Sequence, residues 1–183
     1  MTDYFAALDQ PRAPWLDRAE LKEAFHRKTL QAHPDVTRSG ESQDFAALNE
    51  AYQVLQDPKR RLQHLLVLQN AAPPSQNQIV PADLQELFMS IGELTQRTTR
   101  VLEKNRAASN PLSRSLLKAE LMSMEKEADD LARKVRELSA SAEERLRKTD
   151  CKDTAELSSL HQRFAYLGRW SEQLDELRFE LTL

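Results

Sequence analysis

Residues 17–58 read DRAELKEAFHRKTLQAHPDVTRSGESQDFAALNEAYQVLQDP, and this stretch decides the fold of the first part of the chain. Asp17 and Glu20 have the spacing of a capping box, so we expect a helix to begin there. That helix continues to about Gln31. Pro34 disfavours helical backbone at the residue before it, so the chain must turn at His33. The stretch therefore predicts two helices joined by a tight turn and a polar loop.

One further helix is expected before this pair and another after it. The second helix itself carries an apolar face at helical spacing, made of Phe45, Leu48, Tyr52 and Leu55. Asp57 and Pro58 are a good cap and first residue for another helix, which buries Leu62, Leu65 and Leu66. Thr2 or Asp3 caps a short helix with Tyr4, Phe5 and Leu8. The first part of the chain is thus predicted to hold four helices.

A proline-containing stretch, NAAPPSQNQIVPAD, covers residues 70–83 and marks the expected domain boundary. Three apolar stripes follow it, and the middle one predicts a helix from about Leu112 to Lys148. Three amphipathic helices with short connections favour an antiparallel bundle. We therefore expect an all-α protein with a four-helix domain at residues 1–70, a linker at 71–83 and a three-helix bundle at 84–183.

Composition excludes several classes of protein. The 183 residues carry a net charge of −3, which gives no overall basic field for nucleic acid or for an anionic membrane. The 3 glycines disfavour a sheet-rich fold or a phosphate-binding loop. Cys151 is the only cysteine, so the sequence predicts no disulfide, no metal site and a cytoplasmic location. We find no motif of an enzyme and expect no cofactor.

The tripeptide His33, Pro34 and Asp35 is the most specific signal in the sequence. It follows a helix with basic residues and precedes QDFAALNEAYQVLQDPKRR. In this context, residues 3–68 resemble the J-domain of DnaJ-type co-chaperones. The resemblance implies that the tripeptide is required to accelerate ATP hydrolysis by a DnaK-type chaperone, and that the protein has no active site of its own.

Basic side chains precede this turn, and the resemblance implies that they bind the chaperone. They are Lys22, His26, Arg27 and Lys28. Lys22 and His26 are neighbours on one helix face, where they can present positive charge to an acidic groove. Lys59, Arg60 and Arg61 form a second basic group, which we interpret as a solvated surface.

The whole chain also resembles HscB, the J-type co-chaperone of iron–sulfur cluster assembly. The resemblance rests on the opening DYF, on the long connection LDQPRAPWLD, on RRLQHLL in the fourth helix and on a helical C-terminal domain. It implies that the first domain engages a DnaK-like chaperone of the HscA type. The bundle would bind an IscU-like scaffold protein.

The HscB resemblance also implies a scaffold-binding surface on the first and last helices of the bundle. Matching LFMSIGELTQ to the family pattern places Phe88, Met89, Glu93 and Gln96 on it, and RFAYLGRW places Tyr166 there. The alternative is that these aromatic side chains simply pack the bundle.

Three functions remain open at this point. The first is an HscB-like co-chaperone that stimulates a DnaK- or HscA-type ATPase and delivers an IscU-like scaffold for iron–sulfur cluster biogenesis. The second is a J-domain protein that delivers another client, and the third is a helical adaptor that stimulates no ATPase. We expect a monomer or weak dimer, with neither a nucleic acid nor a membrane as partner.

Overall fold

The computed structural model describes residues 2–31, 41–71 and 79–182, with the side chains of all of these except 41–44. His33, Pro34 and Asp35 lie outside the described residues. The helices are α1 (Tyr4–Ala7), α2 (Arg18–Gln31), α3 (Glu41–Gln56), α4 (Pro58–Leu68), α5 (Gln85–Ala107), α6 (Pro111–Lys148) and α7 (Thr154–Thr182), with a 3-10 turn, η1 (Ala82–Leu84), before α5. The predicted all-α fold class is confirmed.

Aspartate side chains cap the starts of α1, α2 and α4. The Oδ1 atom of Asp17 accepts hydrogen bonds from the backbone N–H groups of Ala19 and Glu20. Asp57 accepts in the same way at the start of α4, and Asp3 does so at the start of α1. Each carboxylate satisfies N–H groups that have no partner inside the helix. The predicted caps at Asp17 and Asp57 are confirmed.

The contacts divide the chain into two units. The first unit contains Met1–Gln76 and Ala142–Phe164, and the second contains Asn77–Ser141 and Ala165–Leu183. This division differs from the expected one, which assigned all residues after 83 to the bundle. The ends of α6 and α7 that meet at their connection belong to the first unit.

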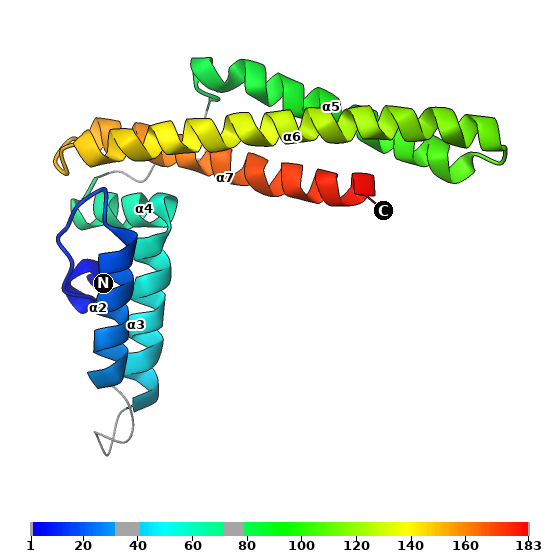
Figure 1. Ribbon diagram of the computed structural model, residues 1–183. Coiled ribbons are helices and arrows are strands. Elements are labelled where there is room, and N and C mark those ends of the chain that lie inside the picture. The colour runs from blue at the N-terminus through cyan, green and yellow to red at the C-terminus, as the bar shows by residue number, and fades with distance from the viewer. Residues whose placement is uncertain (1, 32–40, 72–78, 183) are drawn as a thin grey trace. The chain divides into compact units, whose positions relative to one another are not determined.

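In the first unit, α2 and α3 pack side by side in opposite directions, and α1 and α4 also contact α3 (Figure 1). The core contains the buried side chains Phe5, Leu21, Leu55, Leu62 and Leu66. This arrangement is the helical pair that the sequence predicts on either side of the turn.

Residues 142–164 complete this first core. Leu146, Leu157 and Leu160 are at most 1% exposed and belong to the same apolar cluster as Phe5. Polar contacts accompany them, because the guanidinium of Arg18 lies 2.6 Å from Glu143. The apolar stripe of the last helix predicts that Leu157 and Leu160 are buried, but a stripe does not specify the partner against which it packs.

In the second unit, α5 runs alongside the parts of α6 and α7 that belong to this unit, and together they form a three-helix bundle (Figure 1). Its core contains Ile91 and Leu94 from α5, Met124, Ala128 and Val135 from α6, and Leu167, Leu174 and Leu177 from α7. The predicted bundle is therefore present. None of the helices in the described ranges has the length and apolar character needed to cross a membrane.

Candidate functional site

The outward face of α2 presents most of the basic side chains predicted to bind a partner. Leu21 and Ala24 face the core, and the Phe25 ring stacks on Tyr52 of α3 with a centroid distance of 4.5 Å. This packing turns Lys22 and His26 outward. Both are exposed, and neither is ion-paired with a carboxylate of the described residues.

Arg27 is exposed as well, whereas Lys28 has a different environment. The Lys28 ammonium lies 2.7 Å from the carboxylate of Asp9, and its side chain is only 27% exposed. Asp9 has a φ of 51°, in the turn that follows α1. Lys28 therefore ties α2 to this turn, while Lys22, His26 and Arg27 remain available to a partner.

Two apolar side chains flank the segment that holds the predicted turn. Leu30 near the end of α2 is 71% exposed, and Phe45 in the first turns of α3 is 52% exposed. Leu30 was not among the residues predicted to bind a partner, although its spacing gave a signal: it lies about 180° around the helix from the buried Leu21. Lys22, His26 and Leu30 are spaced four residues apart, so they form one outward stripe that leads toward the C-terminal end of α2.

The second basic group is only partly a solvated surface. Lys59 and Arg60 are exposed, but Arg61 is 4% exposed. Its Nε donates to the carbonyl oxygen of Pro14 at 2.7 Å, and a second nitrogen donates to that of Leu55 at 2.6 Å. Burial lowers the pKa of Arg61 to about 10, so it stays a cation at neutral pH. The surface interpretation was therefore wrong for Arg61, which fastens α4 to the segment before α2.

His64, on the next turn of α4, is also buried and holds α1. Its Nε2 accepts a hydrogen bond from the backbone N–H of Tyr4 at 3.1 Å, so that nitrogen carries no proton. Burial lowers the pKa of His64, which favours the same neutral form. Arg61 and His64 therefore position the helices of the first unit and do not form a binding surface.

In the second unit, the residues predicted to bind the scaffold divide into exposed and buried members. Phe88 is 47% exposed, and Met89, Glu93 and Gln96 are exposed too. Tyr166 is only 8% exposed, which differs from its expected position on the surface. Its burial fits the alternative interpretation, in which this ring packs the bundle.

The structure nevertheless brings Phe88 and Tyr166 into one aromatic cluster. The ring centroid of Trp170 lies 6.3 Å from that of Phe88 and 5.5 Å from that of Tyr166. The guanidinium of Arg169 covers the Tyr166 ring at 4.8 Å. Tyr166 and Trp170 thus form a rigid support beneath Phe88. A Cβ at Gly92, one turn further along α5, would meet nothing within 4 Å.

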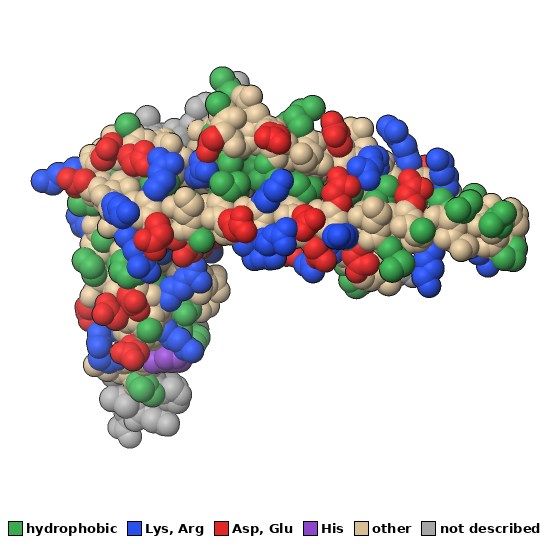
Figure 2. All heavy atoms as spheres, turned by 45° about the horizontal axis from the view of Figure 1, so that its top comes forward, with side chains coloured by type: hydrophobic (Ala, Val, Ile, Leu, Met, Phe, Trp, Pro, Cys, Tyr) green, Lys and Arg blue, Asp and Glu red, His purple; other side chains and the backbone are tan. Residues whose placement is uncertain are grey.

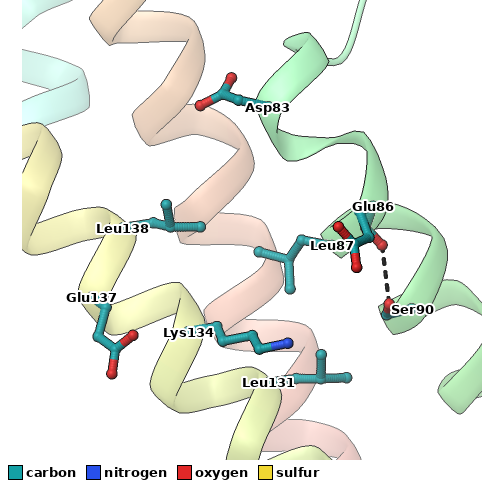
Figure 3. Close-up of a pocket in the computed structure, with 8 residues that line it drawn as sticks. All are labelled: Asp83, Glu86, Leu87, Ser90, Leu131, Lys134, Glu137 and Leu138. Atoms are coloured by element: carbon teal, nitrogen blue, oxygen red, sulfur yellow. Dashed lines mark hydrogen bonds between the residues drawn. The ribbon is translucent and has the colours of Figure 1, made fainter.

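A groove of about 330 Å³ lies between the start of α5 and α6, on another side of α5 (Figure 3). Its apolar wall is formed by Leu87, Leu131 and Leu138, and Lys134 extends from α6 toward α5. The residues that line it are Asp83, Glu86, Leu87, Ser90, Leu131, Lys134, Glu137 and Leu138. This set contains no cysteine or histidine, and no group of metal ligands occurs among the described residues. The groove therefore offers no pairing of a nucleophile with a histidine base.

Comparisons with known proteins agree with this geometry. The family model described as DnaJ domain matches residues 3–64. Chaperone protein DnaJ 2 of Thermus thermophilus is 45% identical over 60 residues, which are 32% of this chain and 21% of that protein. Protein psi1 of Schizosaccharomyces pombe is 42% identical over 64 residues, or 33% of this chain and 17% of that protein. The chain spans only about a fifth of the length of such curated relatives.

Two solved structures share the fold over nearly the whole chain. The chaperone HscB from Vibrio cholerae aligns with a TM-score of 0.52 and 23% identity, covering 97% of this chain and 99% of that one. The human co-chaperone protein HscB aligns with a TM-score of 0.53 and 20% identity, covering 96% and 82%. The all-α architecture expected from the sequence therefore occurs in these two solved structures.

Proposed function

Because residues 3–64 form a DnaJ domain in a chain with the fold of the HscB structures, we propose that this chain is a co-chaperone. Its first unit stimulates ATP hydrolysis by a chaperone of the DnaK or HscA type. It has no catalytic residues of its own and acts in the cytoplasm. Its second unit delivers an IscU-like scaffold during iron–sulfur cluster biogenesis.

The outward stripe of α2 is the observation that carries the first half of this proposal. Lys22, His26 and Leu30 form one face, which combines positive charge with an apolar end. Such a face complements an acidic groove with an apolar edge on the ATPase. The tripeptide His33–Pro34–Asp35 follows directly in the sequence, and Asp35 is suited to a charge-assisted bond with a basic residue of the partner.

A steady-state ATPase assay of a DnaK-type chaperone tests this half. We expect stimulation by the wild-type chain and its loss in His33→Gln and Asp35→Asn. Lys22→Ala weakens stimulation, whereas Lys126→Ala, which removes an exposed lysine from the second unit, leaves it unchanged. Equal, unstimulated rates for all variants would support a helical adaptor and overturn the proposal.

The cluster of Phe88 on Trp170 supports the second half, because a supported and half-exposed aromatic ring is typical of an interface anchor. Pull-down with an IscU-like scaffold tests it. Phe88→Ala and Met89→Ala are expected to weaken binding. Phe179→Ala removes another exposed phenylalanine, on α7, and serves as the matched control.

Two results separate the remaining functions. Stimulation of the ATPase without scaffold binding would indicate that the second unit delivers another client. Scaffold binding that is indifferent to Phe88→Ala, Met89→Ala and a Glu93→Gln/Gln96→Ala double variant would contradict the surface assigned to it. Micromolar dissociation constants are expected for both contacts, since small transient interfaces bind weakly.

A further inference from the structure

The end of the hairpin formed by α5 and α6 has no core of its own. Val101 on α5 and Met124 on α6 are the last buried residues on either side of the connection. Between them, in a stretch that is fully described, none of residues 102–123 is buried. In this hairpin end (residues 102–123), Leu117 and Leu121 pack against the bundle core, but Leu112, Leu116 and Met122 stay exposed.

Exposed apolar side chains lie on one side of the start of α6, opposite the leucines that pack against the bundle core. Leu112 is 72% exposed and Leu116 is 66% exposed, while Met122 is exposed elsewhere on the helix. At about 100° per residue, the positions relative to Leu112 are about 40° for Leu116, 140° for Leu117, 180° for Leu121 and 280° for Met122. Leu117 and Leu121 pack against the bundle core, so Leu112, Leu116 and Met122 form an exposed apolar arc on the opposite side of α6.

The same region concentrates positive charge. Residues 104–119 contain Lys104, Arg106, Arg114 and Lys118 and no carboxylate; with Glu103 and Glu120 at its edges, the hairpin end still carries a formal charge of +2, from four cations and two carboxylates, in a chain with a net charge of −3. All four side chains are exposed, and none has a carboxylate partner among the described residues. Figure 2 shows hydrophobic side chains gathered at this end of the α5–α6 hairpin, with Lys and Arg side chains beside them.

We propose that the hairpin end docks on an anionic lipid surface. Leu112, Leu116 and Met122 enter the boundary between headgroups and acyl chains, and the basic side chains contact the headgroups. An exposed apolar arc flanked by basic side chains is the pattern of a helix that lies in a membrane interface. A second copy of this chain would bring like charges together. The net charge of the chain predicted no membrane partner, because a net charge does not reveal a local concentration of cations.

Co-sedimentation of the full chain with lipid vesicles tests the proposal. We expect binding to vesicles of phosphatidylcholine and phosphatidylglycerol, little binding to phosphatidylcholine alone, and weaker binding at high salt. The double variant Leu112→Ser/Leu116→Ser should lower partitioning on the order of tenfold or more. Arg114→Gln/Lys118→Gln should lower it roughly 30-fold, since each basic residue near the surface contributes a factor of about five.

Matched controls use side chains outside the hairpin end. Ile79→Ser removes another exposed apolar side chain, and Lys126→Gln/Arg136→Gln removes two exposed cations from the middle of α6. Neither should change partitioning. Absence of wild-type binding, equal binding to neutral vesicles, or full binding by the double leucine variant would each overturn the proposal. The last result would indicate purely electrostatic adsorption. ATPase stimulation is independent of these variants, so the two proposals fail separately.

Discussion

Leu157→Ala tests whether residues from the start of α7 complete the core of the first unit. Leu157 is fully buried in the same apolar cluster as Phe5, Leu55 and Leu62. Removing a buried leucine side chain beyond Cβ costs about 3 kcal/mol, within the usual range for such truncations. The slope of the free energy of unfolding against urea for a unit of this size is about 1.5 to 3 kcal/mol per molar, so the midpoint should fall by about 1 to 2 M.

The two tryptophans of the chain allow this change to be located. Trp15 packs on the first core, beneath the guanidinium of Arg147 at 4.6 Å, and Trp170 belongs to the second core. In a Trp170→Phe background, fluorescence therefore reports the first unit alone. Leu157→Ala and the reference chain are unfolded with urea in this same background.

The control is Leu30→Ala, which truncates an exposed leucine of the first unit and should change the free energy of unfolding by less than about 0.5 kcal/mol. An unchanged urea midpoint for Leu157→Ala in the Trp15 signal would refute the reasoning. It would mean that the first unit reaches its full stability without α7.

Three further perturbations have definite signs. Burial lowers the pKa of His64 and of His161 in the folded state, so folding favours their neutral forms. The resulting stability is fully present above the unfolded pKa of about 6.5 and is lost as the pH falls through the folded pKa. Urea midpoints should therefore fall from pH 7.5 to pH 5.5, and a midpoint that rises on acidification would contradict this. Lys28→Met should lower the melting temperature slightly, by the equivalent of up to about 1 kcal/mol, because the ion pair of Lys28 with Asp9 is partly exposed. If ATPase stimulation falls while the melting temperature stays unchanged, Lys28 belongs instead to the partner-binding residues. Gly92→Ala should stabilise the second unit by about 1 kcal/mol, because the added Cβ meets nothing within 4 Å and alanine favours a helix. A lower thermal midpoint by circular dichroism would contradict this prediction.

The helices were predictable because their signals are local. The predicted cap at Asp17 and the Asp57–Pro58 start of α4 are both present in the structure. Each depends on residues within one or two turns of the helix end. The burial of Leu62, Leu65 and Leu66 followed from their spacing alone.

Tertiary contacts were harder to predict, because spacing does not identify the opposite surface. The apolar stripe of the last helix predicted burial for Leu157 and Leu160 without indicating that they join the first core. Arg61 was expected on the surface because it is charged, yet the backbone carbonyls of Pro14 and Leu55 accept its hydrogen bonds inside the fold, and Pro14 lies 47 positions away. Tyr166 was expected on the surface because the family pattern places an aromatic residue there. That pattern does not show that the Tyr166 ring packs beside Trp170.

The partner-binding residues divide in the same way. Lys22 and His26 lie on the outward face of α2 as expected, because their exposure follows from the buried face opposite them. The ion pair of Lys28 depends on a turn nineteen positions earlier in the numbering, which no helical pattern encodes. The tripeptide His33–Pro34–Asp35 remains a prediction from the sequence.

The discontinuous first unit has a consequence for biosynthesis. Its first segment ends at Gln76 and its second ends at Phe164, so about 90 residues must still be translated before the missing part of its core exists. At cellular elongation rates this delay is roughly 5 to 20 s. During that interval the nascent chain exposes the apolar sides of α1 to α4 at the ribosome. The first unit is therefore completed only after most of the second unit has been synthesised.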